Sequence, residues 1–119
     1  MILVTGGAGY IGSHTVVELI SNGYEVLIVD SLYNSDISVL DAIEKVSGVR
    51  VAFEKIDLRD KSALLALASK YEITSVIHFA AFKAVKESKE NPLKYYENNI
   101  LGLVNILYLM KECACKQLI

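Results

Sequence analysis

A glycine-rich turn near the N-terminus constrains the fold of this chain more than any other feature. Four apolar residues, Met1–Val4, lead into a segment that holds four of the seven glycines, and an amphipathic stretch follows. The spacing is Gly6-x-x-Gly9-x-x-Gly12, with Gly7-x-Gly9-x-x-Gly12 nested inside it. A strand that turns through glycines into a helix lets backbone N–H groups approach an anion, and the helix dipole favours negative charge there. The pattern therefore predicts a phosphate site between a first strand and a first helix.

A second apolar strand indicates that the ligand is a dinucleotide. The run Val26–Val29 ends in Asp30, 18 residues after Gly12. An acid at this place is positioned to accept hydrogen bonds from the hydroxyl groups of an adenosine ribose. A 2′-phosphate there would be repelled by the carboxylate, so the predicted cofactor is NAD rather than NADP. The structural alternative is that Asp30 only caps a turn or a helix.

Composition and charge argue against several other classes of function. The chain has 119 residues, 53% of them hydrophobic, with one proline and a net charge of −2, which is typical of one compact domain. Its basic residues are scattered, so we expect no nucleic-acid partner. Cys113 and Cys115 are interpreted as reduced thiols, and His14 and His78 as structural, because no further ligands lie at metal-binding spacing. We expect no metal, no membrane contact and a cytoplasmic location.

Apolar runs alternate with helical patterns along the whole chain. The expected strands are 2–5, 26–29, 50–54 and 75–79, and residues 117–119 resemble the start of a fifth. A helix of about six turns is expected from Asn91-Pro92 onward, since an N-cap candidate precedes a proline suited to the first turn. Continuous apolar runs separated by helices indicate an α/β fold with a parallel sheet covered on both faces. Right-handed crossovers predict a Rossmann-like doubly wound sheet, order 3-2-1-4, truncated after about four strands.

Ligands of open parallel sheets bind beyond the carboxyl ends of the strands. Four clusters follow the four expected strands: Gly6–Gly12, Asp30–Ser35, Asp57-Leu58 and Phe79–Lys83. Because these ends meet at one edge of the sheet, the clusters are expected to form one site.

Individual residues of these clusters have expected roles. Asp57 and Leu58 would flank an adenine, with Asp57 accepting from its amino group; a cap of the helix near Asp60 is the alternative for Asp57. The small pair Ala80-Ala81 would let the dinucleotide approach the backbone. Lys83 would reach a phosphate or a ribose, or else remain a solvated loop lysine.

Blocks of sequence along the chain carry a resemblance that extends beyond the glycine turn. They are Thr5–His14, Asp30 with Asn34-Ser35, Ile77–Ala81, Lys83–Val85, Glu87-Ser88 and Pro92–Asn99. Together they resemble the N-terminal part of the UDP-glucose 4-epimerase family, within the extended short-chain dehydrogenase/reductases. This implies that residues 1–119 form an NAD-binding Rossmann domain. The expected cofactor-binding residues, from the motif and the resemblance, are Gly6, Gly9, Tyr10, Ile11, Gly12, Asp30, Asn34, Ser35, Asp57, Leu58, Phe79, Ala80, Ala81, Lys83 and Asn98.

The resemblance also implies an activity for the parent enzyme. Members of the family are isomerases of galactose metabolism that epimerise UDP-sugars at C4 by transient hydride transfer to NAD through a 4-keto intermediate. Their catalytic serine and Tyr-x-x-x-Lys pair lie beyond the residue where this chain ends, and no tyrosine here has a lysine four positions on. We therefore expect no catalytic residue in this chain and no activity from it alone. A related nucleotide-sugar dehydratase or epimerase, and a noncatalytic NAD-binding module, are the alternatives.

The helix that begins at Pro92 has a wide apolar arc. In the family this helix packs at a two-fold interface, so the full-length enzyme is expected to be a homodimer with a UDP-sugar as its substrate. Packing on the sheet alone is the alternative for this arc.

Two positions depart from the family pattern. Lys86 stands where the family usually has glycine, and Ala81-Phe82 where it often has glycine-leucine. A cation at position 86 would either pair with the diphosphate of a sugar nucleotide or obstruct it.

Overall fold

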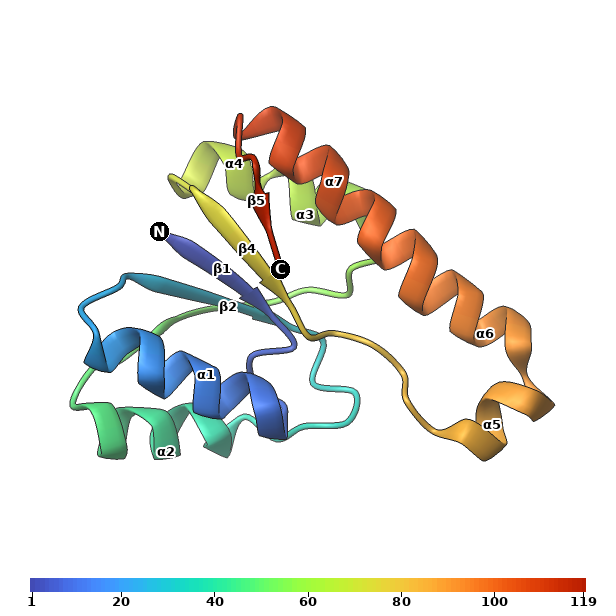
Figure 1. Cartoon of the computed structure of the whole chain (residues 1–119), viewed down its shortest axis with the longest axis horizontal. Coiled ribbons are helices and arrows are strands. Elements are labelled where there is room, and N and C mark those ends of the chain that lie inside the picture. Colours follow the sequence, from blue (N-terminus) through green and yellow to red (C-terminus); the bar gives the residue numbers. More distant parts are fainter.

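The computed structural model describes all 119 residues and contains a five-stranded parallel sheet with helices on both faces (Figure 1). The strand order is β3-β2-β1-β4-β5. The elements in chain order are β1 (Ile2–Thr5), α1 (Tyr10–Ser21), β2 (Val26–Asp30), α2 (Ser38–Ser47), β3 (Ala52–Lys55), α3 (Lys61–Leu65), α4 (Leu67–Lys70), β4 (Ser75–His78), α5 (Val85–Glu90), α6 (Pro92–Tyr96), the π-helical segment η1 (Glu97–Leu101), α7 (Gly102–Glu112) and β5 (Gln117–Leu118).

The sheet separates two hydrophobic cores. Successive side chains of a strand point to opposite faces, so Leu3 packs with α3, α4 and α7 whereas Val4 packs with α1 and α2. Figure 1 shows these two helical layers on either side of the strands. Every residue of β2 is buried, which explains its unbroken apolar run. No helix combines the length and the apolar character that crossing a membrane requires.

The predicted strand order is confirmed, and the short β5 lies where residues 117–119 were expected to begin a fifth strand. The short β5 pairs with β4 in the register Ser75↔Gln117 and Val76↔Leu118. Ala114 adopts a left-handed φ of 53° after α7, and the chain then returns along the sheet. A further backbone bond from His78 to the carbonyl of Ile119, 2.8 Å long, extends this edge.

The helices differ from the predictions in three places. The long helix from Pro92 is continuous to Glu112, but its middle, η1, winds as a π-helix. The helix expected between the third and fourth strands is split into α3 and α4 at Ala66. Helix α5 was missed, because none of its residues is buried and so it has no apolar periodicity.

Candidate functional site

A cavity of about 350 Å³ lies at the carboxyl ends of β1 to β4. All fifteen residues expected from the sequence to bind a cofactor line it, which brings together loops from four separate parts of the chain. Six further residues complete the lining: Ser31, Tyr33 and Phe82 lie within the predicted clusters, whereas Val29, Ile56 and Ala84 lie outside them.

Two glycines of the turn have no room for a side chain. Gly6 has a left-handed φ of 69°, and a Cβ there would lie 2.7 Å from the backbone nitrogen of Ala80. A Cβ on Gly12 would lie 2.2 Å from the carbonyl oxygen of Gly6. Gly9 is the N-cap of α1 and offers no side-chain cap, so the first N–H groups of the helix are left for another acceptor. The start of α1 is therefore built to receive an anion.

Asp30 joins the glycine turn to the loop after β2. One carboxylate oxygen accepts from the backbone N–H of Ala8 at 3.1 Å. The other accepts from the N–H of Leu32 at 2.9 Å and from the hydroxyl of Ser35 at 3.1 Å. Asp30 thus does cap a turn, but a carboxylate offers about four acceptor sites. It retains capacity for a ligand hydroxyl.

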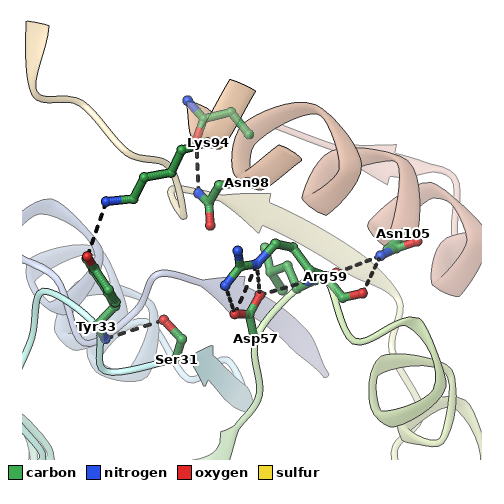
Figure 2. A network of polar contacts seen from close by, with 9 residues as sticks. Ser31, Tyr33, Asp57, Arg59, Lys94, Asn98 and Asn105 are labelled. Atoms are coloured by element: carbon green, nitrogen blue, oxygen red, sulfur yellow. Dashed lines mark hydrogen bonds and ion pairs between the residues drawn. The ribbon is translucent and has the colours of Figure 1, made fainter. Parts of the chain in front are cut away.

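Asp57 is paired with a residue that sequence reasoning missed. Arg59 donates from Nη2 to Asp57 at 2.5 Å and from Nε at 3.0 and 3.1 Å, as Figure 2 shows. This guanidinium lowers the pKa of the Asp57 carboxyl below its usual range. The cap of α3 is Asp60, which accepts from the N–H of Ala63 at 3.0 Å. The helix-cap alternative for Asp57 is therefore wrong, and its fixed negative charge faces the cavity.

Two asparagines of the long helix hold cavity loops in place. Asn105 of α7 is buried and donates to the carbonyl of Leu58 at 2.8 Å. Asn99 of η1 accepts from the N–H of Phe82 at 2.8 Å and donates to its carbonyl at 3.1 Å. Asn98 donates to the Asn99 oxygen at 3.0 Å and lines the cavity. Sequence reasoning selected Asn98 only; the signal for Asn105 was a polar residue within an apolar helical stripe.

The remaining polar residues singled out in the sequence lie outside the cavity lining. His78 contacts the hydroxyl of Thr5 through Nδ1 at 2.6 Å, and burial lowers the pKa of its imidazole. His14 is exposed and packs edge-on against Tyr10. Lys86 is exposed on α5. No group of three or more histidine, cysteine, aspartate or glutamate residues is placed to hold a metal ion.

A parallel sheet of order 3-2-1-4-5, with a glycine turn after β1 and an acid ending β2, defines a Rossmann-like protein of the α/β class. A family model described as GDP-mannose 4,6 dehydratase matches residues 3–119. The chain belongs to this family.

Three individual proteins show how close the similarity is. UDP-glucose 4-epimerase 2 of Arabidopsis thaliana is 48% identical over 99% of this chain. The crystal structure of a UDP-glucose 4-epimerase from Stenotrophomonas maltophila, with bound NAD and formylated UDP-arabinopyranose, matches 98% of the chain at a TM-score of 0.94 and 46% identity. A UDP-glucose 4-epimerase from Bifidobacterium longum, in complex with NAD⁺ and UDP, matches 98% at a TM-score of 0.95 and 39% identity. The chain spans only 35% of the length of each.

Proposed function

We propose that residues 1–119 form an NAD-binding Rossmann domain, the cofactor-binding part of a cytoplasmic UDP-glucose/UDP-galactose 4-epimerase of galactose metabolism. The observation that carries the proposal is the hydrogen bond between Ala8 and Asp30, which joins the glycine turn to the acid at the end of β2. This one contact sets an anion site and a ribose site beside each other. Identity of 48% to an epimerase favours that activity over the related dehydratases.

The lining residues suggest how NAD would lie. The diphosphate would sit on the backbone of the glycine turn at the start of α1, next to Tyr10 and Ile11. Asp30 would accept from the ribose hydroxyls, with Asn34 and Ser35 beside it. Asp57 and Leu58 would bracket the adenine. The remaining half of the cofactor would pass along Phe79, Ala80, Ala81, Lys83 and Asn98.

In the proposed reaction, bound NAD supplies the acceptor for a hydride from C4 of a UDP-sugar. The contribution of this chain is to bind and orient the cofactor and to exclude water from it. Proton transfer from the sugar hydroxyl needs a basic group near the cofactor. No tyrosine of the chain has a lysine four positions on. A noncatalytic NAD-binding module is therefore the second candidate for these residues.

A homodimer is proposed from the outer face of the long helix. Leu93, Ile100, Leu107 and Tyr108 along α6, η1 and α7 are exposed and apolar. A continuous apolar face of this kind is typical of a protein–protein contact. Pairing of two such faces about a two-fold axis would bury it symmetrically.

Calorimetric titration with NAD and with NADP tests the proposed cofactor. The chain should bind NAD more tightly, because the carboxylate of Asp30 repels a 2′-phosphate. NADP binding as tight as NAD binding would reject the assignment. If neither nucleotide gave a measurable heat of binding, the proposed function as a whole would be rejected.

A further inference from the structure

Two aromatic rings meet between loops whose strands are not neighbours. Tyr33 lies on the loop after β2, and Phe82 lies on the loop after β4. Their ring centroids are 5.1 Å apart at an interplanar angle of 48°. Both side chains line the cavity. Because β1 separates β2 from β4 in the sheet, this contact spans the edge where the glycine turn leaves β1.

Lys94 of α6 holds the two rings together. Its ammonium donates to the hydroxyl of Tyr33 at 3.2 Å, and Figure 2 shows the side chain reaching from the helix to that loop. The same ammonium lies 5.3 Å from the ring centroid of Tyr33 and 5.1 Å from that of Phe82, within the range of cation–π attraction. Glu87 fixes the ammonium through an ion pair of 2.5 Å, which lowers the pKa of the carboxyl and raises the pKa of Lys94.

The two sides of this contact are held unequally. Asn99 binds both backbone groups of Phe82, and the Phe82 ring also packs on the buried Tyr95 at 5.7 Å. The side chain of Tyr33 is 63% exposed, and its backbone N–H reaches only the hydroxyl of Ser31, at 3.3 Å. Phe82 is therefore the fixed side, and Tyr33 is the side that can swing away at little cost.

We propose that Tyr33, Phe82 and Lys94 form a clasp over the cavity, which opens to admit the dinucleotide and then retains it. This inference rests on the proposed function and adds to it the residues that control entry and exit. Both rings line the cavity that the glycine turn also lines, so a dinucleotide bound on that turn would leave only when the rings part.

Stopped-flow binding of NADH, followed by its fluorescence anisotropy, measures the clasp directly. The contact exists without a ligand, so losing it lowers the barrier to entry and to exit alike. Phe82→Leu should raise both the association and the dissociation rate by about threefold to tenfold, the range for one aromatic pair, and change Kd less than twofold. Tyr33→Phe keeps the ring but loses the bond to Lys94, so both rates should rise less. Lys94→Met, which leaves the packed rings in place, should behave like Tyr33→Phe.

Tyr24→Ala is the matched control, because Tyr24 is an exposed aromatic residue at the opposite end of the strands. Its rates should equal those of the unaltered chain. Unchanged rates in the Phe82 and Lys94 variants would overturn the clasp while leaving the proposed function intact. A rise in dissociation alone would also overturn it, since that result indicates direct contact with the ligand. If the unaltered chain bound no NADH, the proposed function would fail and the clasp with it.

Discussion

At the scale of single residues, the carboxylate of Asp30 accepts hydrogen bonds from three residues in two separate loops. Asp30→Asn removes one charged acceptor from a carboxylate that holds the glycine turn and the loop after β2. We expect a loss of about 1–3 kcal/mol in the free energy of unfolding. NAD affinity should fall about tenfold to a hundredfold, and the preference over NADP should narrow. Urea unfolding and calorimetry measure these effects. Asp41→Asn, in an exposed ion pair with Arg50, should change neither by a comparable amount.

His78 predicts how stability depends on pH. Burial lowers the pKa of its imidazole from 6.5 in the folded chain, so the unfolded chain binds the proton more readily. The free energy of unfolding should therefore be retained above pH 6.5 and fall as the pH drops from 6.5 toward the folded pKa. Urea unfolding across this window should show that slope, and His78→Asn should remove it. If the slope disappeared in the His14→Gln control instead, the effect would belong to His14 and the prediction for His78 would be wrong.

At the scale of elements, the exposed apolar face of α6, η1 and α7 leads to a prediction about the dimer. Ile100→Glu places a charge midway along the exposed apolar face proposed for the two-fold contact. Loss of a central contact residue costs about 2 kcal/mol or more, so the dimer should weaken at least tenfold. Size-exclusion chromatography with light scattering reports the mass. Val46→Glu, at an exposed position of α2, serves as the control. A strictly monomeric full-length protein would reject the dimer, whatever the variants do.

The elements that sequence reasoning recovered are those with a buried stripe or an unbroken apolar run. Helix α2 and strand β2 fall in this group, because burial leaves a helical spacing of apolar residues in α2 and an unbroken apolar run in β2. Helix α5 has no buried residue and left no period. The π-helical winding of η1 left no sequence signal either, since Asn99 is held by Phe82 of the loop after β4 and Asn98 is held by Asn99. Such contacts exist only once distant segments have met.

At the scale of the whole molecule, one topological rule located the candidate site. The carboxyl ends of parallel strands meet at one edge, so residues after four strands could be grouped before any contact was known. Partners across the cavity could not be found in this way. Tyr33 and Phe82 belong to the predicted clusters, but their contact with each other depends on side chains that reach between loops. Arg59 follows no motif, and its pairing with Asp57 depends on how the loop after β3 folds.

The isolated chain should convert no UDP-galactose. In the proposed function its residues would hold and orient a cofactor, but no tyrosine has a lysine four positions on to tune it as a proton acceptor. The measurement is UDP-galactose conversion by purified residues 1–119 with added NAD. Turnover above a control without protein would contradict this expectation.

The central position of β1 has a consequence for how the chain is made. Ile2 pairs with Val26 on one side but with Ser75 on the other, 73 positions later. A ribosome adds roughly 5–20 residues per second, so β1 waits about 4–15 s for its second neighbour. For that interval one flank of this central strand is open to a foreign strand. The first strand of this sheet to be synthesised is thus among the last to be enclosed, and nascent chains are most exposed to misassembly before residue 78 emerges.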